Sequence, residues 1–317
     1  MDMGGRGTLA LKARGVLVLV LAMLCVFGEA PVDAKTIGSM QALEWNQTTS
    51  TMGGDAWAVI VDTSRYWLNY RHHANAMAIY RSVRSLGIPD SRIILMVAED
   101  FSTNPRNVRE GQLFADLGLE TDLYDGGVEV DYAGGEVSVP NFIRLLTDRH
   151  FSWIPKSKRL LTTGKNNVLL YITGHGGENF MKFRDHEQIL GEDFADAIEE
   201  MHRMDRFKEL LVVVDTCKAS TFCQYIATPN VICLGSSMRG ENSYSAHINR
   251  EIGNSLVDQL SYGIFQFLRK LSRGSSVTLQ QMFDHLSQVT KSSTPSIETF
   301  GFERSLRKVK VLEFFGN

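Results

Sequence analysis

The possible folds are limited most by a set of short apolar runs, each of which ends in a polar residue. Three of these runs are WAVIVD (57–62), NVLLYIT (167–173) and ELLVVVD (209–215). Because both sides of such a strand are apolar, both must be covered, which is typical of a parallel sheet with helices on each face. The segments RIILMVA (92–98) and NVICLGSS (230–237) indicate two more strands of this kind.

Helical patterns occupy the segments between these strands. Apolar residues recur at helical spacing within 278–289 and in three further stretches, which contain Ala76, Ile79, Tyr80, Val83 and Leu86, then Phe194, Ala197, Ile198 and Met201, and then Leu256, Leu260, Ile264, Phe267 and Leu271. This alternation predicts an α/β fold in three layers, with a mainly parallel central sheet flanked by helices.

Two segments depart from the alternation of buried strands and helices. GGVEVDYAGGEVSV (126–139) alternates apolar with acidic residues and then turns at two glycines, which predicts a β-hairpin outside the main sheet. KVKVLEFF (308–315) is compatible with one more strand. Since no repeat or low-complexity linker interrupts the pattern, we expect a single domain over residues 56–317.

The N-terminus has the pattern of a secretory signal peptide. Basic residues precede an apolar run at 15–28, and the small residues Val32 and Ala34 suit the positions before a cleavage site. We therefore expect a signal peptide over 1–34 and a polar segment over 35–55. A signal anchor is the alternative, but the apolar run is short for a membrane span.

Two further features fit the secretory pathway. Asn46 begins the only Asn-x-Ser/Thr sequon and is a candidate glycosylation site. Loss of Cys25 with the signal peptide would leave Cys217, Cys223 and Cys233, and this odd count predicts that one thiol stays free or pairs with another chain. The net charge of −3 gives no indication of nucleic-acid binding.

A histidine and a cysteine follow two of the predicted strands. His175 follows the strand 167–173, and Cys217 follows the strand 209–215. If these strands are neighbours, about 5 Å apart, an imidazole and a thiol meet at the carboxyl edge of the sheet. Histidine can take the proton of a thiol and return it to a leaving amine. The N–H groups of Gly176 and Cys217 would then form an oxyanion hole, although each residue alone is as well explained by core packing or a plain turn.

The residues around this pair carry a family resemblance. YITGHGG, VVVDTC and NYRH resemble the legumain group of caspase-like cysteine peptidases. Within that group, TSRYWLNYRH, YRSVRSLGIPDSRIILM, NPRNVREG, VEVDY and SKRLL are similar to the catalytic subunits of glycosylphosphatidylinositol (GPI) transamidases, and the likeness covers 56–317. The resemblance implies a caspase-like fold and a catalytic dyad of His175 and Cys217, with Asn69 steadying the histidine.

The resemblance also implies a substrate pocket. Arg71 and Glu241 would bind the residue before the scissile bond, with Ser236 and Ser237 on the pocket wall. From the sequence alone, a surface ion pair between Arg71 and Glu241 is the simpler interpretation.

A structural calcium site is implied by the same resemblance. Its ligands would be Asp90, Glu129, Asp131 and the carbonyl of Ile93, and hard oxygen ligands suit calcium. Alternating charges on a hairpin are otherwise typical of a solvated face. No cofactor is expected for catalysis.

The implied reaction is transamidation in the endoplasmic reticulum lumen. The enzyme would cleave the C-terminal GPI-attachment signal of precursor proteins and transfer the acyl group, through a thioester on Cys217, to the ethanolamine amine of the GPI glycolipid. Other membrane subunits of a transamidase complex would hold the chain at the membrane. One alternative is a legumain-like asparaginyl endopeptidase, but those enzymes carry a prodomain for which we expect no room here. A non-catalytic docking subunit is the other, and the presence of Asn69, His175 and Cys217 together argues against it.

Overall fold

The computed structural model describes residues 55–316, which contain a seven-stranded sheet as their central layer. The strand order is β12-β9-β8-β4-β1-β2-β3, and every pair is parallel except β9 with β12. The strands are β1 (Trp57–Asp62), β2 (Ile93–Val97), β3 (Tyr132–Ala133), β4 (Asn167–Thr173), β8 (Glu209–Asp215), β9 (Val231–Gly235) and β12 (Ser296–Phe300). The predicted α/β fold with a mainly parallel sheet is confirmed. The predicted signal peptide and Asn46 lie outside the described residues.

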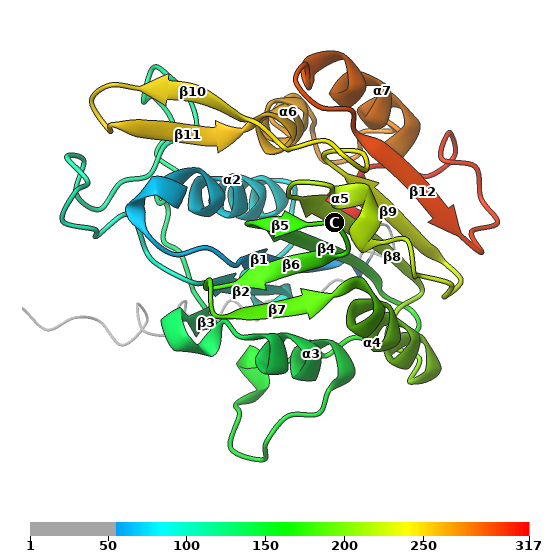
Figure 1. Ribbon diagram of the computed structural model, residues 1–317. Coiled ribbons are helices and arrows are strands. Elements are labelled where there is room, and N and C mark those ends of the chain that lie inside the picture. Colours follow the sequence, from blue (N-terminus) through cyan, green and yellow to red (C-terminus); the bar gives the residue numbers. More distant parts are fainter. Residues whose placement is uncertain (1–54, 317) are drawn as a thin grey trace, which may run out of the picture. The chain divides into compact units, whose positions relative to one another are not determined.

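Helices cover both faces of the sheet (Figure 1). One face carries α2 (Tyr70–Ser85), α6 (Gln259–Leu268), α7 (Leu279–Val289) and α8 (Leu312–Phe315), and the other carries α3 (Val139–Thr147) and α4 (Gly191–Arg203). The short helix α5 (Ala219–Phe222) follows β8. Successive strand residues point to opposite faces, so the continuous apolar runs supply both cores at once.

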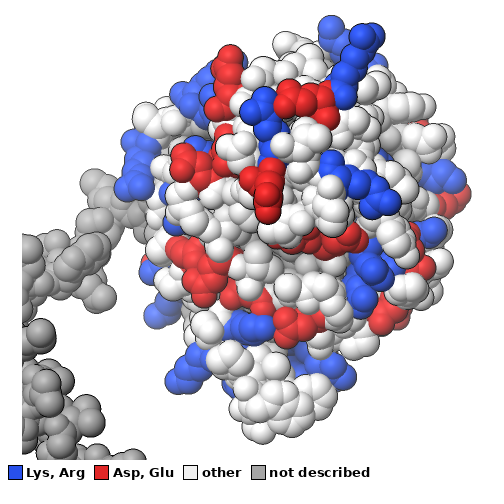
Figure 2. Space-filling model, turned by 90° about the vertical axis from the view of Figure 1, so that its left-hand side faces the viewer, with Lys and Arg blue, Asp and Glu red and all other residues white. Residues whose placement is uncertain are grey.

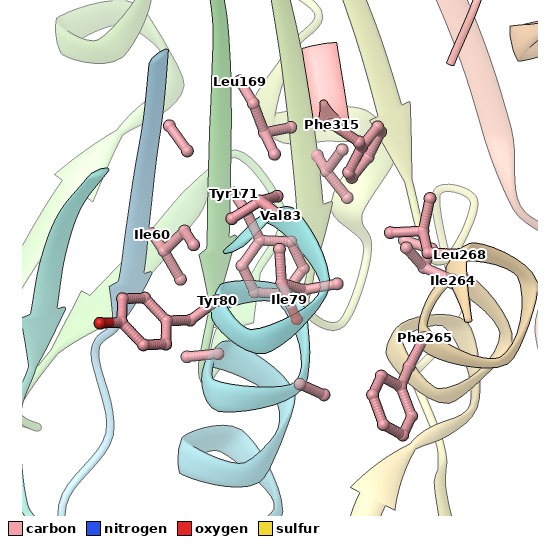
Figure 3. Packing of buried hydrophobic residues seen from close by; sticks show 14 of the residues in the cluster. Ile60, Ile79, Tyr80, Val83, Leu169, Tyr171, Ile264, Phe265, Leu268 and Phe315 are labelled. Carbon is pink, nitrogen blue, oxygen red and sulfur yellow. The ribbon is translucent and has the colours of Figure 1, made fainter. Parts of the chain in front are cut away.

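The packing of β1 illustrates this division. Ile60 belongs to the core under α2, whereas Val59 and Val61 belong to the core under α3 and α4. Figure 3 shows Ile60 and Tyr171 of the sheet facing Ile79 of α2. All five side chains are fully buried, at 0% exposure. The sheet is therefore held from both sides, and its carboxyl edge is left for the loops that carry polar side chains.

Two smaller sheets and four short 3-10 helices complete the described chain. The first sheet contains β5 (Gly176–Gly177), β6 (Phe180–Phe183) and β7 (Glu187–Leu190), and the second is a hairpin of β10 (Ser245–Asn249) and β11 (Asn254–Asp258). The 3-10 helices are η2 (Trp67–Asn69), η3 (Asp90–Arg92), η4 (Gly134–Glu136) and η5 (Lys156–Lys158).

The hairpin predicted over 126–139 is wrong. Tyr132 and Ala133 instead pair in parallel with Met96 and Val97, so this segment supplies the edge strand β3 of the main sheet. The chain cannot return as a second strand because Ser138 caps helix α3, accepting a hydrogen bond from the N–H of Asn141.

Two other expectations also need correction. The helix expected from Leu256 onward begins at Gln259, because 254–258 pairs with β10 as strand β11. The segment 308–315 adds no strand to the main sheet, whose edges are β3 and β12, and makes only an isolated bridge between Lys310 and Thr278. It ends in helix α8, which buries Phe314 and Phe315 completely.

Positive and negative side chains are interspersed over the face shown in Figure 2. Such mixing does not favour binding to a polyanion. Among the helices of residues 55–316, none has the length and apolar character needed to cross a bilayer.

Candidate active site

The main sheet brings His175 and Cys217 to the same edge. Strands β4 and β8 are parallel neighbours, and their last paired residues are Thr173 and Asp215. His175 and Cys217 each lie two positions beyond this pair, and the N–H of Gly174 donates to the carbonyl of Asp215 across the gap (3.3 Å). The two loops therefore start at the same height on strands about 5 Å apart. The predicted meeting of an imidazole and a thiol required the two strands to be neighbours, and the strand order shows that they are.

Gly174 is required by the path that leads to His175. Its φ is +152°, and a Cβ there would lie 2.0 Å from the Oγ1 of Thr63. Thr63 is fixed because its N–H and hydroxyl both donate to the carbonyl of Thr173 (3.1 and 3.2 Å). A side chain at position 174 would therefore displace the histidine loop.

Asn69 fixes the tautomer of His175. The Nδ2 of Asn69 donates to the carbonyl of Arg65, which leaves its Oδ1 as an acceptor for the Nε2 of His175 at 2.8 Å. Since an amide oxygen cannot donate, Nε2 must carry the proton, and Nδ1 is left with a free lone pair. Asn69 is buried at the end of η2. It therefore holds the imidazole ring of His175 in one orientation, with Nδ1 available as a base.

The surroundings of His175 favour its neutral form. Burial lowers the pKa of His175, and the charges of Arg71 and Lys182 lower it further, while Asp185 opposes them. A second ring, that of His72, packs edge-on against His175 with centroids 4.9 Å apart. His72 is fully buried, and its pKa is lowered by that burial. At neutral pH His175 is therefore unprotonated and able to accept the proton of a thiol.

Charge changes near His175 should move the acidic limb of the pH profile in opposite directions. Replacing Lys182 with Gln removes a positive charge, so the pKa of His175 rises and activity is lost at a higher pH. Replacing Asp185 with Asn lowers that pKa, and activity persists to a lower pH. The measurement is kcat/KM against pH, which reports the free enzyme. If the acidic limb shifts in the same direction in both variants, or does not shift in either, the role of His175 as the base is contradicted.

Cys217 is the free thiol among the described cysteines. It is half-buried, whereas Cys223 and Cys233 form a disulfide that joins the end of α5 to strand β9. The odd count predicted that one thiol stays free or pairs with another chain, and within the described chain that thiol is Cys217. The disulfide lies in the core under α4. It therefore ties the segment 216–223, here called the nucleophile loop, to the sheet.

Gly176, one of the two predicted oxyanion-hole donors, has its N–H free of the neighbouring strand. The N–H of Lys182 donates to the carbonyl of His175 (2.8 Å), and Gly176 lies opposite Met181 in the next pair of the antiparallel ladder. Because hydrogen-bonded and non-bonded pairs alternate, the N–H of Gly176 points away from β6. A Cβ on Gly176 would lie 2.5 Å from the Oγ1 of Thr216, so its main chain packs directly against the residue before Cys217.

Ser236 and Ser237 support the nucleophile loop from below. Both are fully buried, at 0% exposure, and both hydroxyls donate to the carbonyl of Thr216 (3.1 and 2.9 Å). They also accept from main-chain N–H groups, Ser236 from Thr216 (3.2 Å) and Ser237 from Ala219 (3.1 Å). These hydroxyls therefore help to fix the main chain next to Cys217, and the place of the two serines on a pocket wall stays a prediction.

Arg71 and Glu241 do not pair with each other in the described structure. The Nε of Arg71 binds the Oδ1 of Asp258 at 3.1 Å. The carboxylate of Glu241 accepts from the N–H groups of Met238 (3.1 Å) and Thr294 (2.8 Å) and from the hydroxyl of Thr294 (2.9 Å). The surface ion pair that the sequence allowed is therefore wrong. Arg71 contributes a positive charge close to His175, and Glu241 organises the loop after β9.

Buried carboxylates near the dyad were missed by sequence reasoning. Asp215, two residues before Cys217, accepts hydrogen bonds from the hydroxyls of Ser243 (2.8 Å) and Ser261 (2.5 Å). Burial, and then the nearby charge of Asp215, raises the pKa of Asp258 to about 7. Asn75 donates to Asp258 at 2.6 Å. The sequence signal for Asp215 was its position at the end of a predicted strand, whereas Asp258 lies in a segment expected to be helical and had no such signal.

The acidic residues proposed for calcium approach one another without forming a finished ligand set. Asp131 accepts from the N–H of Leu95 (2.9 Å), and burial together with Glu129 and Asp90 raises its pKa to about 6. A hydrogen bond with Asp90 raises the pKa of Glu129. Ile93 begins the neighbouring strand β2. Within residues 55–316, no three acidic, histidine or cysteine side chains are arranged to hold one ion, so calcium stays a prediction.

Comparison with known proteins is consistent with this site. The Peptidase C13 family matches residues 56–317. The GPI-anchor transamidase of Saccharomyces cerevisiae is 46% identical over 82% of the chain and 64% of its own length. The chain thus spans somewhat less than two thirds of that relative.

Other relatives are covered more fully. The GPI-anchor transamidase of Schizosaccharomyces pombe is 45% identical over 82% of the chain and 69% of its own length, and that of Homo sapiens is 38% identical over 96% and 76%. Among solved structures, caspase-1 from Spodoptera frugiperda overlaps with a TM-score of 0.45 at 9% identity, over 82% of this chain and 92% of that one. On the sequence matches, the chain belongs to the peptidase C13 family, alongside relatives named GPI-anchor transamidase.

Proposed function

We propose that this chain is the catalytic subunit of a GPI transamidase. The observation that carries the proposal is the tautomer of His175, whose Nδ1 is free to act as a base at the strand edge that also bears the free thiol of Cys217. The relatives are named GPI-anchor transamidase, and we propose on that basis that the substrate is a precursor protein with a C-terminal attachment signal. A non-catalytic docking subunit would have no use for this arrangement.

The first half-reaction forms a thioester. Nδ1 of His175 takes the proton of Cys217, and Sγ attacks the carbonyl carbon of the residue that will carry the anchor (the ω residue). The N–H groups of Gly176 and Cys217 would stabilise the negative oxygen of the tetrahedral intermediate. The C–N bond then breaks, and the leaving amine of the C-terminal tail takes the proton from His175.

The second half-reaction transfers the acyl group. The amine of the GPI ethanolamine attacks the thioester carbonyl and gives a proton to His175. The C–S bond breaks, an amide forms, and the sulfur recovers its proton from His175. The thioester keeps the reactivity of the acyl group, so the exchange needs no ATP. Water competes for the same carbonyl, and the site favours the amine by positioning it.

The second candidate is an asparaginyl endopeptidase, which would use the same dyad and let water resolve the thioester. The chemical nature of the new C-terminus tests the choice: an amide with the acceptor supports transamidation, and a free acid at internal asparagines supports hydrolysis. The identity of the relatives favours transamidation. We also propose that partner membrane subunits hold the chain in the endoplasmic reticulum lumen, which co-purification from detergent-solubilised membranes would test.

Calcium binding is a separate part of the proposal. Asp90, Glu129, Asp131 and the carbonyl of Ile93 would hold the ion, whose positive charge would oppose the burial and the neighbouring carboxylates that raise the pKa of Asp131. Since bound metal stabilises the folded state by mass action, a chelator should lower the melting temperature of the wild-type protein by roughly 5 °C.

The matched control is the double variant Glu129→Gln and Asp131→Asn. It lacks both the ligands and the repulsion, so its melting temperature should not respond to the chelator. Restoring calcium to the stripped wild-type protein should recover the lost stability. An equal response of both proteins to chelation would remove the site from consideration.

A further inference from the structure

A cavity of about 590 Å³ lies outside the catalytic pair, between the β10–β11 hairpin and helices α6 and α7. These elements lie next to one another at the upper side of Figure 1. Its lining has no acidic side chain and contains six residues with nitrogen-bearing side chains: His247, Gln259, Gln266, Lys270, His285 and Lys291. The mechanism above uses none of these residues.

Two ammonium groups give the cavity its charge. Lys270 and Lys291 are both exposed residues of the lining. Burial and then the charge of Lys270 lower the pKa of His285, so that imidazole is neutral at neutral pH and offers a hydrogen bond beside the lysine. With Gln266 adding an uncharged amide, the cavity combines positive charge with several donors, which suits a group with multiple anionic oxygens.

His247 adds an independent sign of a binding site. It lies in strand β10 with φ of +59°, a left-handed conformation that is costly for a residue with a side chain. Its ring packs on Tyr262, with centroids 4.3 Å apart, and its buried Nδ1 has no hydrogen-bond partner in the described chain. Burial lowers the pKa of His247, while the charge of Asp116 opposes that effect. The strained backbone thus holds this ring in the cavity lining, and a ligand reaches the unpaired Nδ1 only if the ring moves from its buried position.

The cavity wall is connected to the nucleophile loop by hydrogen bonds. The Oε1 of Gln259 accepts from the N–H groups of Lys291 (3.1 Å) and Ser292 (3.2 Å). Thr294, two residues further on, binds the carboxylate of Glu241. The carbonyl of Glu241 accepts from the N–H of Lys218 at 2.9 Å, next to Cys217 in sequence. A ligand in the cavity would thus contact the segment that supports the catalytic loop.

We propose that this cavity binds a phosphate ester. Lys270 and Lys291 neutralise the phosphate, and His247, His285 and Gln266 bind its oxygens. On the proposed function, the ester is a phosphate of the GPI acceptor, whose reactive amine is attached through ethanolamine phosphate. That identification rests on the proposed function, whereas the phosphate site itself does not.

Isothermal titration of the full-length protein with ethanolamine phosphate tests the site. The wild type and the inactive Cys217→Ala variant should bind equally, and ethanolamine without phosphate should bind neither. The double variant Lys270→Ala and Lys291→Ala should bind at least about tenfold more weakly, because it loses both charges. Lys165 and Lys308 are exposed lysines outside the lining, so the pair Lys165→Ala and Lys308→Ala is the matched control.

Three outcomes would overturn the inference: no binding by the wild type at millimolar ligand, equal affinity of the two double variants, or equal binding of ethanolamine alone. Turnover is not needed for this measurement, so failure of the phosphate site and failure of the transamidase proposal are distinguishable. If the site belongs to the acceptor, the Lys270→Ala and Lys291→Ala variant should also raise the KM for the acceptor and leave that for the precursor unchanged.

Discussion

Replacing Cys217 with alanine is expected to abolish product formation, with a loss of at least about a thousandfold in kcat. No other described cysteine can substitute, because Cys223 and Cys233 are joined in a disulfide. Replacing His175 with alanine should cost nearly as much, since the thiol then has no base to take its proton and is a weak nucleophile. The assay is conversion of a precursor by the complex isolated from detergent-solubilised membranes.

Stability measurements separate a catalytic role from a structural one. His175 and Cys217 are half-buried at the edge of the sheet, so both alanine variants should melt within a few degrees of the wild type. Replacing Cys223 with serine is the opposite case: it breaks a buried disulfide and should lower the melting temperature, while the loss of turnover should be much milder than in Cys217→Ala. Turnover close to wild type in Cys217→Ala, or complete loss of turnover in a folded Cys223→Ser variant, would mean that the nucleophile is misassigned.

The strands that carry the dyad could be predicted to the residue. The runs at 57–62, 167–173 and 209–215 coincide with β1, β4 and β8 because they are buried on both faces and each ends at a polar turn. The hairpin β10–β11 was missed, since most of its residues are half-exposed and carry no clear alternation. Leu256 lies in strand β11, but its spacing from Leu260 and Ile264 of helix α6 is the spacing of one helix face. The helix was therefore predicted to begin too early.

The closeness of the loops that carry His175 and Cys217 could be inferred from the sequence, but the polar network around them could not. His175 and Cys217 follow predictable strands, and parallel neighbours place their ends together. Asp258, by contrast, is 183 residues from Asn75, and the hydrogen bond between them depends on how the β10–β11 hairpin packs on α2. Pairing of that kind leaves no periodic signal. The same holds for Ser236 and Ser237, whose burial under the nucleophile loop is a consequence of tertiary packing.

Hydrazine is expected to replace the glycolipid as acceptor when the natural acceptor is depleted. If a thioester on Cys217 is the common intermediate, its fate depends on which nucleophile reaches the acyl carbon, and a small strong nucleophile needs no binding site of its own. The product would be a precursor that lacks its C-terminal tail and ends in a hydrazide at the ω residue. Mass spectrometry of the new C-terminus identifies it.

This experiment also tests which residues act before the acceptor binds. Hydrazide formation should require Cys217 and His175 and should compete with GPI attachment. It should not require Lys270 or Lys291, because hydrazine carries no phosphate, so the double lysine variant should lose GPI attachment more than hydrazide formation. An asparaginyl endopeptidase would cleave after internal asparagines without a hydrophobic tail and release mainly free acid. A free acid at internal asparagines would reject transamidation, whereas a tail-dependent hydrazide at the ω residue would separate acyl transfer from acceptor binding within one active site.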